Sequence, residues 1–259
     1  MVGRARRPAG WFQNVAAVTV LSLLGSAAAA LAGCAYHGDS ATDIDNPAVQ
    51  KFAWFSFLDG NDIREACAAL GPKAPARYRL IYNGQYEKQL RVYEIDAIPS
   101  GGANLHVRTK GGTNLADWWI RDTADLLAPW RWRESTAALS PEEMAQFHKA
   151  LTESGYGSGA PQGLRLPSQD FYWVASGCEA GQFHFYAWRA KQGQLDAVRF
   201  QDFLLRHDGT GLAFRQPYVL PIEESSNYRP AGGKNGRNPS SNFTLSVSGE
   251  GIGGLLNAF

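Results

Sequence analysis

The sequence predicts an α+β fold, in which a mainly antiparallel β-sheet has a few helices packed on it. Two features support this prediction. Several short segments alternate apolar and polar residues with the period of two that is typical of a half-buried strand. One other segment repeats its apolar residues with the period of an amphipathic helix. Together they favour a single sheet with helices laid on it.

The first strands are predicted at residues 77–82 and 89–95, with Asn83-Gly84 between them. Both segments alternate with a period of two, and Asn-Gly is a strong signal for a tight hairpin turn. A third strand is predicted at residues 105–107. These segments therefore predict a hairpin extended by a neighbouring strand.

The later strands are predicted at residues 171–177, 182–188 and 197–205. In the second of them, alternation places His184 on the face opposite the neighbouring phenylalanines. We expect that face to be solvated.

One helix is predicted between Ser140 and Gly155. Ser140 is placed as its N-cap, and Glu143 stands at the position that completes a capping box. Apolar residues then recur at helical spacing, and a glycine ends the pattern. The apolar stripe consists of Met144, Phe147 and Leu151.

The composition predicts one folded domain at residues 51–222, because no Pro/Gly/Ser-rich hinge interrupts this range. The length also allows two small domains. Residues 34–50 are small and polar, which is typical of a flexible tether. Residues 223–259 are rich in breaker residues, so we expect a largely disordered tail. Within it, residues 243–247 alternate in a way that suits a short strand.

The N-terminal region combines a basic start with a hydrophobic signal segment. Residues 1–14 contain three arginines and no acidic residue, and residues 15–33 carry no charge. Three interpretations remain open. The run approaches the length of a membrane-spanning helix, although its distal half is only weakly hydrophobic. It also suits a cleaved secretory signal with a site at residues 28–30, or the signal of a lipidated precursor.

The run ends in Leu-Ala-Gly-Cys at residues 31–34, which resembles the lipobox of bacterial lipoprotein precursors at all four positions. The resemblance implies that residues 1–33 are a lipoprotein signal peptide and that Cys34 carries the lipid. It further implies a lipid anchor in the membrane of the cell envelope, with the domain in the periplasm. The next residue is Ala35 rather than aspartate, which favours the outer membrane if the source is Gram-negative.

With Cys34 lipidated, Cys67 and Cys178 remain as an even pair in an oxidising compartment, and we expect a disulfide between them. Such a bridge closes a loop of roughly 100 residues and contributes about 4–5 kcal/mol in the chain-entropy model. The alternatives are two separate buried thiols or one reactive cysteine. Neither a Cys-x-x-Cys motif nor a basic cluster supports a reactive thiol.

The charge balance and the motifs exclude several functions. Removing the three N-terminal arginines leaves 22 basic against 24 acidic residues, which is atypical of a nucleic-acid-binding protein. There is no phosphate-binding loop, dinucleotide fingerprint or histidine pair at metal-ligand spacing. The sequence therefore assigns no catalytic, cofactor-binding or metal-binding residue, and we expect no cofactor.

Four tryptophans cluster in the middle of the chain. Indole rings stack on sugars and are enriched in binding hot spots, so the cluster is a candidate surface for a cell-wall glycan. The alternative, which we favour, is a strand whose tryptophans pack inside while the arginines between them face water. The cluster consists of Trp118, Trp119, Trp130 and Trp132.

These observations predict a membrane-anchored envelope lipoprotein whose domain is a non-catalytic binding or structural module. Its partner would be an envelope protein or a cell-wall glycan, and not a nucleic acid. The alternative is a periplasmic hydrolase or small-ligand-binding protein, with a site assembled from His184, His207 or Asp208. The domain is otherwise similar only to uncharacterised proteobacterial lipoproteins, and this likeness implies no activity.

Overall fold

The computed structural model divides into two compact units, Met1–Trp54 and Phe55–Phe259. The structure describes residues 36, 38, 43, 44, 50–112, 131–190, 193–218 and 243–253. All of the β-strands in these ranges belong to the second unit.

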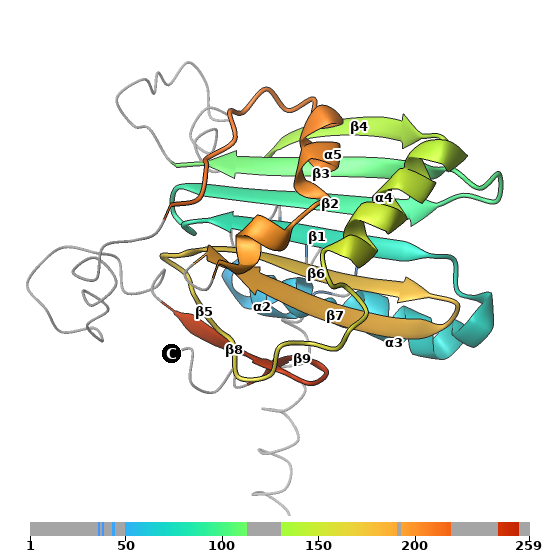
Figure 1. Cartoon of the computed structure of the whole chain (residues 1–259), viewed down its shortest axis with the longest axis horizontal. Coiled ribbons are helices and arrows are strands. Elements are labelled where there is room, and N and C mark those ends of the chain that lie inside the picture. The colour runs from blue at the N-terminus through green and yellow to red at the C-terminus, as the bar shows by residue number, and fades with distance from the viewer. Residues whose placement is uncertain are drawn as a thin grey trace, which may run out of the picture. The chain divides into compact units, whose positions relative to one another are not determined.

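The main sheet is antiparallel throughout (Figure 1). Its strands are Arg77–Gly84 (β1), Gln89–Ala97 (β2), Ala103–Gly111 (β3), Arg133–Leu139 (β4), Phe171–Glu179 (β6) and Gln182–Arg189 (β7). Within the described ranges the six strands follow the order β4-β3-β2-β1-β6-β7. The hairpins β1-β2 and β6-β7 are therefore joined through β1 and β6 at the centre. The predicted α+β fold class is confirmed.

A second, smaller sheet joins segments that lie far apart in the sequence. It contains Arg165–Pro167 (β5), Thr244–Ser248 (β8) and Gly251–Gly253 (β9), in the order β5-β8-β9. The strand predicted at residues 243–247 is confirmed, because positions 243, 245 and 247 are buried while Thr244 and Ser246 between them are not. The rest of the predicted tail, residues 223–242 and 254–259, lies outside the described residues.

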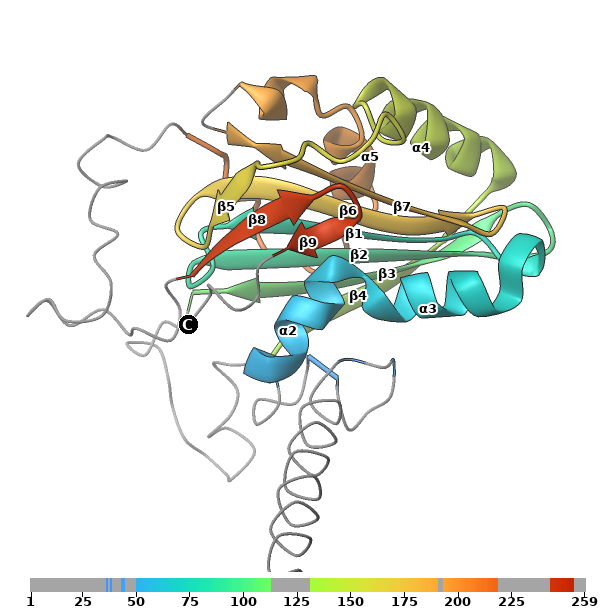
Figure 2. The ribbon, with the colours of Figure 1, turned by 90° about the horizontal axis from the view of Figure 1, so that it is seen from below.

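Helices cover both faces of the main sheet. These helices are Asn61–Leu70 (α3), Pro141–Glu153 (α4) and Gln201–Arg206 (α5). The described residues also form the helix Gln50–Asp59 (α2) and 3-10 turns at Gly71–Lys73 (η1) and Gln194–Ala197 (η5). Figure 2 shows α4 and α5 on one side of the sheet and α3 on the other. We call these two sides the α4 face and the α3 face.

Aromatic side chains dominate the core of the α4 face. Trp173 of β6 lies at its centre, with ring centroids 5.0 Å from Tyr82, 5.9 Å from Tyr93 and 5.3 Å from Phe200. Phe147 of α4 packs against this aromatic layer from the helix side and is fully buried. Because aromatic rings bury large areas, this layer supplies much of the hydrophobic stabilisation on this face.

The strand predicted at residues 197–205 is wrong. Residues 201–206 form α5, and the preceding residues form the end of η5 and a short connection. Phe200, Phe203 and Leu204 are all buried against the α4 face. This i, i+3, i+4 spacing places them on one side of a helix, whereas a strand would place Phe200 and Phe203 on opposite faces.

The predicted β1-β2 hairpin is confirmed, but its turn is displaced. Asn83 and Gly84 continue β1, and the chain reverses at residues 85–88. The Asn83 amide donates hydrogen bonds to the carbonyls of Ser168 (3.0 Å) and Asp170 (2.7 Å). These bonds to a distant loop extend the strand beyond the point that local turn preference indicates.

The α4 helix confirms its sequence signals. Ser140 Oγ accepts a hydrogen bond from the Glu143 amide (3.2 Å), and Glu143 Oε2 accepts one from the Ser140 amide (2.8 Å). The predicted apolar stripe of Met144, Phe147 and Leu151 is buried. The capping box therefore fixes the start of the helix that covers the aromatic core.

Replacing the N-cap, Ser140→Ala, is expected to cost about 1 kcal/mol, because an amide at the start of α4 loses its acceptor. For a domain of this size the melting temperature should fall by about 2–4 °C. Thermal unfolding followed by circular dichroism measures this shift. The matched control is Gln146→Ala, at an exposed position of the same helix, which should leave the melting temperature unchanged. Equal shifts in both variants would contradict the capping role.

Candidate functional site

Helix α3 lies close against β6 and β7 because glycines stand where the backbones meet. Gly60 precedes the helix with a φ of 70°, and a Cβ there would lie 2.5 Å from Ser176 Oγ. Gly181, in the β6-β7 turn, approaches the other end of α3, where a Cβ would lie 2.3 Å from the carbonyl carbon of Gly71. Side chains at either position would push the helix away from the sheet.

The predicted disulfide between Cys67 and Cys178 is confirmed. It joins α3 to β6 across 111 residues of sequence, with the two Cα atoms 5.7 Å apart. Both cysteines are buried and pack with Ile63. The bridge therefore holds the C-terminal half of α3 on the sheet.

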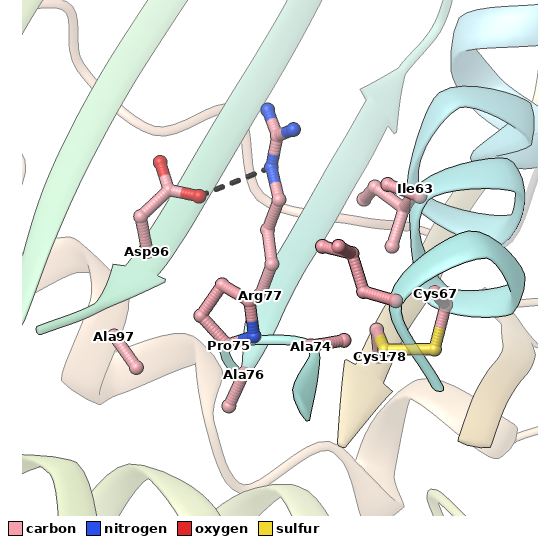
Figure 3. Close-up of a pocket in the computed structure, with 11 residues that line it drawn as sticks. Ile63, Cys67, Ala74, Pro75, Ala76, Arg77, Asp96, Ala97 and Cys178 are labelled. Carbon is pink, nitrogen blue, oxygen red and sulfur yellow. Dashed lines mark ion pairs between the residues drawn. A yellow bond between two sulfur atoms is a disulfide. The ribbon is translucent and has the colours of Figure 1, made fainter. Parts of the chain in front are cut away.

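A small apolar hollow of about 200 Å³ opens beside the disulfide (Figure 3). One wall is the side of α3 that carries Ile63, Cys67 and Leu70, and another is the segment 74–76, which leads into β1. Leu70 is 54% exposed although it is large and apolar. The hollow thus presents hydrocarbon surface at the outside of the domain.

The two charged residues that line the hollow form an ion pair at its edge. Arg77 Nε lies 3.0 Å from Asp96 Oδ1, and the two side chains are 33% and 52% exposed. The Arg77 guanidinium also lies 3.4 Å from Glu94 and 3.7 Å from Asp62. Arg77 is therefore already surrounded by carboxylates, whereas Asp96 extends into solvent.

Behind this edge, the fully buried Arg79 joins α3 to the sheet. Its Nη1 and Nη2 donate to the two oxygens of Asp62 at 2.7 and 2.8 Å, and its Nε and Nη2 donate to Glu94 Oε1 at 3.0 and 2.8 Å. It also donates to the Phe57 carbonyl at 3.0 Å, and its guanidinium stacks 3.8 Å above the Phe57 ring. All three nitrogens of this guanidinium therefore donate hydrogen bonds.

Glu94 completes the network through a second arginine. Its Oε2 accepts a hydrogen bond from Arg108 Nη2 at 2.7 Å. Burial alone would raise the pKa of Glu94, but the charges of Arg79, Arg108 and Arg77 outweigh it and lower the pKa to about 2. Glu94 is therefore a carboxylate at neutral pH, and it stabilises the α3 face as an ion rather than acting as an acid.

On the α4 face, Asp208 has a structural role. It pairs with the buried Arg91, accepts a hydrogen bond from the Tyr93 hydroxyl (2.9 Å) and accepts one from the Thr210 amide (3.0 Å). Burial raises the pKa of Tyr93, so that hydroxyl stays protonated and continues to donate. These bonds fasten the segment after α5 to β2.

The candidate residues of the predicted alternative site do not come together. Asp208 contacts β2, and His207 lies 3.1 Å from Glu143 of α4. His184 lies on β7, which two strands separate from β2. It is half-buried with its ring 6.0 Å from that of Tyr156, so the expectation of a solvated face is wrong. Within the described ranges, no group of three or more His, Cys, Asp or Glu side chains is placed to hold a metal ion.

The tryptophan cluster is only partly described. Trp132 is half-buried just before β4, with Lys110 Nζ 5.9 Å from its ring centroid. Trp118, Trp119 and Trp130 lie outside the described residues, so the choice between core and glycan surface stays a prediction. Cys34 also lies outside them. Among the residues that the structure describes, no helix is long and apolar enough to cross a membrane.

Sequence reasoning missed both the hollow and the ion network. One signal for the network was present, because the alternation of β2 places Glu94 on the same face as Leu90 and Val92. A carboxylate on an otherwise apolar face needs a buried cation. The hollow had no such signal, since its walls come from separate segments.

No protein-family model matches this chain, and comparison with curated proteins and with solved structures found no match.

Replacing Glu94 by glutamine is expected to cost about 3–5 kcal/mol at neutral pH, because buried arginines lose their counter-charge. A carboxyl with its pKa lowered from 4.5 to about 2 stabilises the fold above pH 4.5, and this contribution disappears as the pH falls towards 2. Its size is about 3 kcal/mol. The difference in unfolding free energy between wild type and Glu94→Gln should therefore narrow from pH 4.5 to pH 2.

Denaturant unfolding of both proteins across this pH range tests the prediction. Glu65→Gln, at an exposed position of α3, is the control and should follow the wild-type curve. A difference between wild type and Glu94→Gln that stays constant with pH would show that the charge of Glu94 is not what stabilises the fold.

Removing the disulfide with Cys67→Ala and Cys178→Ala together is expected to lower the unfolding free energy by about 4–5 kcal/mol, since the unfolded chain regains the freedom of a long loop. Thiol counting by mass spectrometry checks the bridge directly. The Cys34→Ala variant should show no reactive thiol until it is unfolded and reduced, and two thiols thereafter. Two thiols that react in the unfolded protein without reductant would disprove the bridge.

Proposed function

We propose that this protein is a lipid-anchored lipoprotein of the bacterial cell envelope and that its domain is a non-catalytic binding module in the periplasm. The lipobox-like sequence that ends at Cys34 supports the anchor. The disulfide between Cys67 and Cys178 fits an oxidising compartment and lends weak support to export.

The observation that carries the binding role is the apolar hollow beside that disulfide. Soluble domains bury most large apolar side chains, so concave apolar surface at the outside is typical of a contact site. Leu70, at the end of α3, adds an exposed leucine to its wall. A partner that covers the hollow would remove this surface from water.

The use of the polar side chains supports binding over catalysis. Asp208 is paired with Arg91, and His207 is paired with Glu143, so each side chain ties one element to another. Glu94 is engaged with arginines on the other face. These groups hold elements together, and none of the three lines the hollow.

Replacing Cys34 by alanine should abolish lipid attachment, because the thioether to the lipid needs this thiol. Cells fed an alkyne-tagged fatty acid should yield labelled wild-type protein in the membrane fraction, while Cys34→Ala should carry no label. A single acyl chain binds membranes only weakly, so stable retention requires the complete anchor.

The control is the protein with Cys67→Ala and Cys178→Ala, which keeps Cys34 and should keep both the label and the membrane fraction. Wild-type protein that carries no label, or a Cys34→Ala variant that is labelled like wild type, would reject the lipid anchor.

A further inference from the structure

We infer that the hollow beside the disulfide receives one aromatic side chain from a partner protein, next to a positive charge that pairs with Asp96. This inference rests on the proposed binding function and names the chemistry of the partner. Size, lining, charge and rigidity of the hollow each support it.

The size of the hollow suits a single aromatic ring. Its volume is about 200 Å³. A cavity of about 150 Å³ already takes up benzene, whereas sites for drug-sized molecules span roughly 300–1,000 Å³. The hollow therefore has room for one ring and lacks room for a larger ligand or a coiled lipid chain.

The lining is suited to an apolar group. The space is surrounded by the side chains of Ile63 and Leu70, by the segment Ala-Pro-Ala at residues 74–76, and by the disulfide. None of these groups offers a hydrogen bond, so water in the hollow has few partners there. Displacing such water by an apolar group favours binding.

The charge at the edge favours a cation next to the ring. Arg77 already lies near three carboxylates, of Asp62, Glu94 and Asp96. Asp96 is half-exposed, and in the described part of the chain its ion-pair partner is Arg77 alone. An incoming ammonium or guanidinium group reaches Asp96 more easily than an incoming carboxylate reaches Arg77, because Asp96 is 52% exposed whereas Arg77 is 33% exposed and already faces three carboxylates.

The walls are rigid before a ligand arrives. The bridge from Cys67 to Cys178 fixes α3 to β6, and Arg79 fixes the start of α3 to the sheet. Pro75 restricts the backbone on the other side. A preformed pocket avoids the cost of ordering loops on binding. Aromatic and arginine side chains that fill such pockets are typical hot spots of protein interfaces.

The test measures the binding of three small probes to the full chain in phosphatidylcholine nanodiscs, by fluorine or proton NMR of each probe. Empty nanodiscs serve as the blank. The probes are para-fluorobenzylamine, which carries a ring and a cation, para-fluorobenzoate, which carries a ring and an anion, and hexylamine, which carries a cation without a ring. We expect the affinity to be highest for para-fluorobenzylamine. Its preference over the benzoate should be about two- to fivefold, the range of an exposed ion pair.

Two variants locate the binding. Ala66→Trp places an indole in the hollow and should lower the affinity for para-fluorobenzylamine at least about tenfold. Ala69→Trp, at an exposed position of α3 that does not line the hollow, is the matched control and should bind as wild type. Asp96→Asn should retain ring binding and lose the preference for the cation. Melting temperatures near that of wild type show that each variant is folded.

The outcomes separate the alternatives. Equal binding in Ala66→Trp and Ala69→Trp would overturn the site, and hexylamine binding as tightly as para-fluorobenzylamine would overturn the aromatic occupant. An unchanged preference in Asp96→Asn would overturn the charge. Each of these results is independent of fatty-acid labelling at Cys34, so failure of the hollow and failure of the lipid anchor are distinguishable.

Discussion

The buried guanidinium of Arg79 is the group on which the α3 side of this domain depends. It takes both carboxylate oxygens of Asp62 from the start of α3, and on the sheet it shares Glu94 with the buried Arg108. Burying a charge in this way costs free energy unless its partners are all in place. The loss of one carboxylate or arginine of the network therefore destabilises the whole network. The position of α3, and with it one wall of the hollow, therefore follows from the charge balance inside the sheet.

The two faces of the sheet are stabilised by different interactions. Packed aromatic rings around Trp173 dominate the α4 face, which also holds the ion pair of Arg91 and Asp208. Ion pairs with fixed geometry occupy the α3 face, where Arg79 and Arg108 flank Phe57. The hollow lies at the edge of the α3 face. A binding surface supported by oriented ion pairs keeps its shape, which suits recognition of one defined group.

Sequence reasoning predicted what short-range periodicity encodes. The β1-β2 and β6-β7 strands, α4 with its Ser140 cap, and the Cys67–Cys178 pair all follow from local pattern or from counting cysteines. It was wrong at residues 197–205, where the buried positions 200, 203 and 204 follow the spacing of a helix and not the alternation of a strand. It missed the ion network and the hollow because their members meet only after folding: Asp62, Arg79 and Glu94 come from three separate elements.

The small sheet has a consequence for how the chain folds. Strand β5 pairs with β8, and its Leu166 lies opposite Leu245, so this strand finds its partner only after a long stretch of later sequence has been made. Contacts of such separation form slowly, because the intervening chain must first be closed into a loop. Until then β5 has an unpaired edge and Leu166 is uncovered, which exposes the newly made protein to aggregation. Pairing of β8 with β5 therefore closes this long loop, and the small sheet is completed only by the C-terminal part of the described chain.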